Sequence, residues 1–150
     1  MKRFDNKTVV VTGASSGIGE ALAREFAARG ANVVLGARSA DKLERITAEI
    51  RATGAQAVCR AVDVVKPEEC ERLIGAAVEH FGGIDVLICN AGLSMRAVFD
   101  GVELDVLHRL MDVNFWGTVY CCKYALPWLQ RSKGSVVGIS SASLLYAAGS

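Results

Sequence analysis

The stretch that decides the fold lies near the start of the chain, where residues 8–19 read TVVVTGASSGIG. Its first five residues favour a strand, and an apolar helical pattern begins within the glycine stretch. Gly13 permits a sharp turn, Gly17 lets backbone approach a pyrophosphate, and Gly19 lets the helix pack closely on a sheet. The N-terminus of that helix would face the anion. A glycine-rich turn without a ligand is the alternative, and the position between strand and helix favours a dinucleotide site.

Short apolar runs alternate with longer helical patterns along the rest of the chain. Nearly continuous apolar runs are typical of parallel strands buried on both faces. Five such runs are present: Thr8–Thr12, Asn32–Gly36, Ala57–Val62, Ile84–Cys89 and Ser135–Ser140. Strand–helix alternation predicts a doubly wound α/β Rossmann fold in three layers, with a parallel sheet of order 3-2-1-4-5. We expect residues 1–150 to form one dinucleotide-binding domain, the N-terminal part of a longer one.

The helices between these strands have recognisable ends. The first begins in the glycine stretch and stops at Gly30. The second follows Ser39 as N-cap and the third opens at Pro67, while Gly54 and Gly82 end them. A longer fourth helix is predicted from Leu104 to Ala125, with Pro127 near its end.

Composition excludes several classes of function. The chain has a net charge of +1, with 51% hydrophobic and 22% charged residues, so no basic surface attracts nucleic acid or acidic lipid. No apolar run is long enough to span a bilayer, and no signal-peptide core follows the start. The five cysteines contain no CxxC pair, which argues against a zinc site or a disulfide framework. We therefore expect a cytoplasmic protein with reduced thiols, no metal, and neither nucleic acid nor membrane as partner.

The end of the second predicted strand indicates which dinucleotide binds. An NAD site normally places Asp or Glu there, to hold the ribose hydroxyls. The sequence has no acid at this point, and Arg38 stands where a 2′-phosphate would lie. A guanidinium suits phosphate in geometry and charge, and Ser15 and Ser39 would add hydroxyl donors. These residues predict NADP(H); the alternative is a solvated surface arginine.

Taken together, the motifs resemble those of the short-chain dehydrogenase/reductases. The glycine turn has that family's TGxxxGxG spacing. The sequence Cys89-Asn90-Ala91-Gly92 is similar to its NNAG motif, with Cys in place of the first Asn. Asp63-Val64 is similar to the pair that meets the adenine ring. Asn114 matches the family's catalytic Asn, and Ser141, after the fifth strand, matches its catalytic Ser. The resemblance covers essentially the whole chain.

The resemblance implies a role for each matching residue. Asp63 and Val64 would border the adenine, and Asn90 would brace the centre of the sheet while Ala91 and Gly92 line the cofactor. The residues that enclose the pyrophosphate and its ribose would be Gly13, Ser15, Ser16, Gly17, Ile18 and Gly19.

Two further residues would then serve the reaction. Ser141 would hold the substrate's carbonyl or hydroxyl oxygen. Asn114 would help to maintain a proton-relay water beside the active-site lysine. The implied function is an NADP(H)-dependent oxidoreductase that transfers hydride between nicotinamide and a small carbonyl or secondary-alcohol substrate.

The family's Tyr-x-x-x-Lys pair is missing from these 150 residues. Tyr146 lies too close to Ser141 to match the tyrosine, and Ser150 stands where the lysine would be. The tyrosine is the family's proton donor for carbonyl reduction, so we expect this chain alone to turn over slowly or not at all. The alternative function is a truncated, inactive protein that binds nucleotide or a partner.

The fourth predicted helix carries apolar residues on more than one face: Leu107, Leu110, Met111, Phe115, Trp116 and Tyr120. Packing on the sheet accounts for some but not all of them. The resemblance implies a homodimer or homotetramer that uses this helix. The identity of the substrate does not follow from the sequence.

Overall fold

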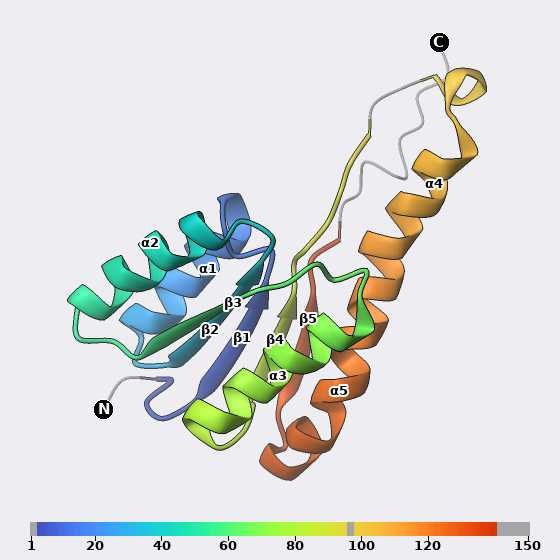
Figure 1. The fold of residues 1–150 in the computed structure, drawn as a ribbon. Helices are drawn as coiled ribbons and strands as arrows, with labels where there is room; N and C mark the ends of the chain where they lie inside the picture. Colours follow the sequence, from blue (N-terminus) through green and yellow to red (C-terminus); the bar gives the residue numbers. More distant parts are fainter. Residues whose placement is uncertain (1–2, 96–97, 141–150) are drawn as a thin grey trace.

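A five-stranded parallel sheet in the order β3-β2-β1-β4-β5 forms the centre of the molecule, as predicted. The computed structural model describes residues 3–95 and 98–140. Figure 1 shows helices α1 (Gly17–Ala28) and α2 (Ala40–Ala52) on one face of the sheet. Helices α3 (Pro67–Phe81) and α5 (Gly117–Ser132) cover the other face. The predicted Rossmann architecture is therefore confirmed.

The strands match the predicted runs to within a few residues at their ends, and β2 extends one residue further, to Ala37. They are β1 (Thr8–Thr12), β2 (Asn32–Ala37), β3 (Ala57–Ala61), β4 (Val86–Cys89) and β5 (Ser135–Gly138). We predicted that β4 begins at Ile84, but it begins two residues later. The Asp85 N–H still donates a 2.9 Å hydrogen bond to the Thr8 carbonyl, but the Thr8 N–H donates to the Asp85 carboxylate at 2.9 Å and not to a backbone carbonyl.

The core consists of two layers that share the sheet. Val9 and Val11 of β1 face the layer of α1 and α2, whereas Val10 faces the layer of α3 and α5. All three side chains are fully buried. Alternating side chains of a strand point to opposite faces, so a central strand must be apolar on both. This explains why β1 reads as an unbroken apolar run.

Glycines end the first three helices as predicted. Gly30, Gly54 and Gly82 have φ values of +94°, +87° and +80°, a region that side chains disfavour. Ser39 occupies the N-cap of α2 as predicted, but its side chain makes no capping hydrogen bond.

The fourth helix is longer than predicted and is interrupted. It comprises α4 (Leu104–Met111), a π-helical turn (Asp112–Trp116) and α5, which runs past Pro127 to Ser132. The prediction that the helix ends near Ala125 was wrong. Proline removes one hydrogen bond, to the carbonyl four residues earlier. Because Pro127 and Lys123 are both exposed, water can satisfy the freed Lys123 carbonyl.

One side of the molecule exposes apolar surface. All four residues of β5 are exposed, including Val136 at 47%. Helix α4 has no buried residue, and Leu104 and Met111 are 69% and 54% exposed. In Figure 1, α4 extends beyond the sheet, in line with α5. The apolar surface is consistent with the predicted oligomer, which stays a prediction. No helix among the described residues is long and apolar enough to cross a membrane.

Gly117 provides a test of how tightly α5 packs against Val64, in the segment that follows β3. A Cβ at Gly117 would lie 2.7 Å from Val64 Cγ2 and 2.9 Å from Val64 Cβ, and the buried, branched Val64 cannot rotate away. We expect Gly117→Ala to lower the free energy of unfolding by about 1–3 kcal/mol. Gly75 of α3 is the matched control, since a Cβ there meets nothing within 4 Å. Gly75→Ala should raise stability by about 0.5–1 kcal/mol in urea unfolding. Equal effects of the two changes would contradict this account.

Candidate functional site

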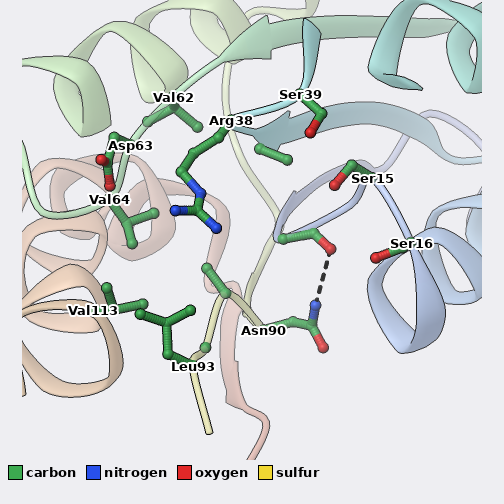
Figure 2. Close-up of a pocket in the computed structure, with 14 residues that line it drawn as sticks. Ser15, Ser16, Arg38, Ser39, Val62, Asp63, Val64, Asn90, Leu93 and Val113 are labelled. Atoms are coloured by element: carbon green, nitrogen blue, oxygen red, sulfur yellow. Dashed lines mark hydrogen bonds between the residues drawn. The ribbon is translucent and has the colours of Figure 1, made fainter. Parts of the chain in front are cut away.

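A cavity of about 280 Å³ opens at the carboxyl ends of the parallel strands. In doubly wound sheets, ligands bind in the crevice outside these strand ends. The lining residues follow β1, β2, β3 and β4, with one residue from the π-helical turn (Figure 2). They are Gly13, Ser15, Ser16, Ala37, Arg38, Ser39, Val62, Asp63, Val64, Asn90, Ala91, Gly92, Leu93 and Val113.

The glycine turn has the geometry that its sequence predicts. Gly13 and Gly17 adopt φ values of +66° and +56°. A Cβ on Gly19 would overlap the Gly13 carbonyl oxygen and lie 2.5 Å from Asn90 Nδ2. Only glycine therefore lets α1 begin this close to the turn. The helix starts at Gly17, so its positive end and free N–H groups lie at the turn that borders the cavity.

Thr12 and Asn90 hold this turn in place. Thr12 Oγ1 accepts hydrogen bonds of 3.0 Å from the backbone N–H groups of both Asn90 and Ala91. In return, Asn90 Nδ2 donates to the carbonyl oxygens of Thr12 (3.1 Å) and Gly13 (3.3 Å); the second bond is the dashed line in Figure 2. The ends of β1 and β4 are thereby fixed to each other directly below the cavity.

Arg38 extends from the end of β2 into the cavity (Figure 2). It makes no ion pair with any described residue, and its side chain is exposed. Ser15 and Ser39 line the same region. An unpaired guanidinium with hydroxyl groups beside it can bind a phosphate.

Asp63 and Val64, which follow β3, line the cavity on the side away from Ser15 and Ser16 (Figure 2). The Asp63 backbone N–H donates a 2.7 Å hydrogen bond to Glu69 Oε2, and Lys66 Nζ lies 3.0 Å from Glu69 Oε1. The Asp63 N–H and then the Lys66 ammonium lower the pKa of Glu69, which therefore stays ionised at neutral pH. This bond fixes the backbone where β3 leaves the sheet, with Val64 6% exposed beneath it.

Asn114 lies in the π-helical turn and holds the loop that follows β4. Its Oδ1 accepts a 2.8 Å hydrogen bond from Leu93 N–H, and its Nδ2 donates 2.9 Å to the Leu93 carbonyl. Both ends of the amide therefore bind the backbone of the same residue. A π-turn shifts the helix register by one residue, and such turns are frequent at functional sites. The role of Asn114 in a proton relay stays a prediction.

Most of the predicted cofactor residues surround the cavity, but not all of them. Gly17, Ile18 and Gly19 belong to α1 and do not line it, and Ile18 is 61% exposed. Asn114 does not line it either. Ser141 and Tyr146 lie outside the described residues. The sequence did not single out Ala37, Val62, Leu93 or Val113, although three of these directly adjoin predicted residues and Val113 precedes Asn114.

Cys89 immediately precedes the loop but takes no part in the cavity. Its side chain is 5% exposed and packs in the core layer of α3 and α5. Burial, with the neighbouring Cys122, raises the pKa of the Cys89 thiol to about 12. The thiol therefore stays protonated at neutral pH and is a poor nucleophile. Cys89 behaves as the small core residue that its apolar run predicts.

The glycine turn, the Asn90 brace and the Asn114 loop contact occur together at one end of a parallel sheet. Residues 7–148 match the family model of the short chain dehydrogenases. The chain belongs to this family. The resemblance seen in the sequence is thus confirmed at the level of the family.

Similar proteins agree with this assignment. An 11-beta-hydroxysteroid dehydrogenase 1A of Arabidopsis thaliana is 42% identical over 139 residues, which is 91% of this chain and 40% of the relative. An 11-beta-hydroxysteroid dehydrogenase A of Arachis hypogaea is 44% identical over 137 residues, or 90% of this chain and 39% of the relative. The chain therefore spans about two fifths of these relatives.

Solved structures share the fold. An alcohol dehydrogenase of Thermococcus sibiricus, complexed with 5-hydroxy-NADP, has a TM-score of 0.85 and 37% identity; the match covers 88% of this chain and 57% of that one. A short-chain type dehydrogenase/reductase of Mycobacterium marinum has a TM-score of 0.90 and 28% identity, over 96% of this chain and 59% of that one.

The two hydrogen bonds of Asn114 predict a pH-dependent defect in Asn114→Asp. A carboxylate accepts from Leu93 N–H but repels the Leu93 carbonyl, so we expect a loss of about 1 kcal/mol of stability at neutral pH. A protonated carboxyl can donate to that carbonyl, which raises the folded-state pKa above the unfolded value. The lost stability should return as the pH falls through the raised pKa toward about 4.

Thermal unfolding across this pH range is the measurement, with Asn114→Leu as the control. Leucine makes neither bond and does not titrate, so its deficit relative to the unsubstituted protein should stay constant with pH. A pH-independent deficit in both variants would show that the amide contact does not act as described.

Proposed function

We propose that this chain is the nucleotide-binding part of an NADP(H)-dependent oxidoreductase, which transfers hydride between nicotinamide and a carbonyl or secondary-alcohol substrate. The observation that carries the choice of cofactor is Arg38. Its guanidinium points into the cavity without an ion-pair partner among the described residues. No acid stands at the end of β2 to hold free ribose hydroxyls. Arg38 therefore favours the 2′-phosphate that distinguishes NADP(H) from NAD(H).

The glycine turn supports binding of the dinucleotide's pyrophosphate. Gly19 brings the start of α1 against Gly13, and the turn residues Ser15 and Ser16 line the cavity. The positive end of α1 would stabilise the phosphate charge. Asp63 and Val64 stand on the far side, where the adenine would lie. The cofactor, once bound, supplies or accepts the hydride, and the residues described here bind and orient it.

Substrate handling rests on the family resemblance. Ser141 would hold the substrate oxygen, and Asn114 would position the loop that contains Leu93. A Tyr-x-x-x-Lys pair further along a longer chain would supply the proton donor. Several relatives are named as hydroxysteroid dehydrogenases, so a hydroxysteroid is the first secondary alcohol to test. We further propose a cytoplasmic homodimer or homotetramer, formed through the exposed apolar surface of α4 and the π-helical turn.

The cofactor proposal predicts a clear preference in binding. We expect residues 1–150 to bind NADPH more tightly than NADH in calorimetric titrations. Arg38→Ala removes the charge-assisted contact to the 2′-phosphate, so it should weaken NADPH binding by about 10- to 100-fold. NADH binding should change much less.

Arg45→Ala provides the charge-matched control. Arg45 lies on α2, is 60% exposed and pairs with Glu49, outside the cavity. Its removal should leave the NADPH:NADH ratio unchanged. Equal binding of the two nucleotides by the unsubstituted chain would refute the NADP(H) assignment.

Binding of NADPH and its oxidation should require different parts of the protein. We expect residues 1–150 to bind NADPH without oxidising it in the presence of ketones, because no Tyr-x-x-x-Lys pair follows Ser141 here. A longer product of the same reading frame that contains this pair should oxidise NADPH at a measurable rate. Turnover by residues 1–150 alone would reveal a proton donor within them. Absence of turnover in the longer protein would favour an inactive nucleotide-binding protein.

A further inference from the structure

A second cavity, of about 560 Å³, adjoins the first at its Arg38 side. Arg38, Val62 and Asp63 line both cavities, so the two are neighbouring compartments on either side of these residues. The second compartment is bordered by the end of β2, the start of α2, β3 and the first half of α3. Its additional lining residues are Ala40, Leu43, Glu44, Cys59, Arg60, Ala61, Glu69 and Arg72.

The sheet register places Arg60 near the end of β2, which Arg38 directly follows. Arg60 of β3 pairs with Gly36 of β2, and Arg38 lies two residues beyond Gly36. Residues paired across neighbouring strands point to the same face of a sheet, so Arg60 and Gly36 share a face. Gly36 faces Leu73 of α3, so this is the α3 face. Because β3 is an edge strand, Arg60 is exposed and can reach along the rim of the compartment.

The charges around this compartment leave two guanidinium groups uncompensated. Glu69 already binds the Asp63 N–H and Lys66, and Arg72 lies 3.9 Å from it. Neither Arg38 nor Arg60 has an ion-pair partner among the described residues. Glu44 and Asp63 are the other acids in the lining, and neither forms an ion pair with these arginines.

We propose that the 2′-phosphate of the cofactor lies where the two compartments meet at Arg38, and that Arg60 is a second guanidinium bound to it from the second compartment. This inference rests on the proposed NADP(H) function. A monoester phosphate carries about 1.5 to 2 negative charges at neutral pH, more than Arg38 alone neutralises. Arg38 reaches this phosphate from the first compartment and Arg60 from the edge strand. Arg60 is then a determinant of cofactor specificity that acts only on the 2′-phosphate.

Two small nucleotides isolate this contact. Adenosine 2′,5′-bisphosphate carries the 2′-phosphate, and AMP is the same molecule without it. The protein is titrated with each by calorimetry, unsubstituted and as Arg60→Gln and Arg60→Lys. Arg109→Gln is the control, because Arg109 is an exposed arginine of α4 that lines neither compartment and gives the same change in net charge.

We expect Arg60→Gln to weaken the 2′,5′-bisphosphate about 10-fold, as the loss of one charge-assisted hydrogen bond predicts. Arg60→Lys keeps the charge but loses the bidentate fork, so it should recover part of the affinity. AMP binding should be unaffected by either change. Affinity for the bisphosphate should also depend less on salt in Arg60→Gln than in the unsubstituted protein.

The result that overturns the inference is a preference for the 2′,5′-bisphosphate that survives in Arg60→Gln as it does in Arg109→Gln. In that case Arg38 alone selects the 2′-phosphate and the NADP(H) proposal stands. If the unsubstituted protein binds both nucleotides equally, the NADP(H) proposal fails and this inference fails with it. An equal loss of AMP and bisphosphate binding in Arg60→Gln would also overturn it, since Arg60 would then act on the fold or on the common part of the ligand.

Discussion

The hydrogen bonds between Thr12 and Asn90 are the constraint on which the rest of the site depends. They join the ends of the neighbouring strands β1 and β4, at the point where both strands leave the sheet. The same Asn90 amide also binds the Gly13 carbonyl, so the glycine turn cannot move independently of β4. Gly19 completes the arrangement, because any side chain there would displace both groups. A rigid turn presents its N–H groups to a phosphate without further ordering cost.

A second set of contacts ties the long helix to this centre. Gly117 lets α5 approach Val64, and Asn114 binds both the N–H and the carbonyl of Leu93. The π-turn between α4 and α5 sets the rotation at which Asn114 meets the loop. The segments that follow β3 and β4 form two walls of the cavity, and the helix that runs from α4 to α5 contacts both. A change in α5 far from the nucleotide can therefore alter the shape of the cavity.

The sequence predicted the parts of the fold that depend on local chemistry. Continuous apolar runs located all five strands, and Gly30, Gly54 and Gly82 located the helix ends, because each glycine meets a local conformational demand. The extension of α5 past Pro127 was missed, since that depends on which face of the helix meets solvent. The motifs predicted most of the cavity lining, but not Ala37, Val62, Leu93 or Val113. These four residues line the cavity because their part of the backbone faces its opening. An apolar residue type in the sequence does not indicate which backbone segments face the opening.

The strand order has a consequence for the sequence of events during synthesis. The segments β1, α1, β2, α2 and β3 are contiguous in the chain and pair among themselves, so they can assemble as soon as they emerge. The bonds from Thr12 to Asn90 span 78 residues and must wait for β4. Contacts over such separations slow folding, because the intervening loop must close first. The glycine turn is therefore made early, and its brace arrives only after Asn90 has left the ribosome.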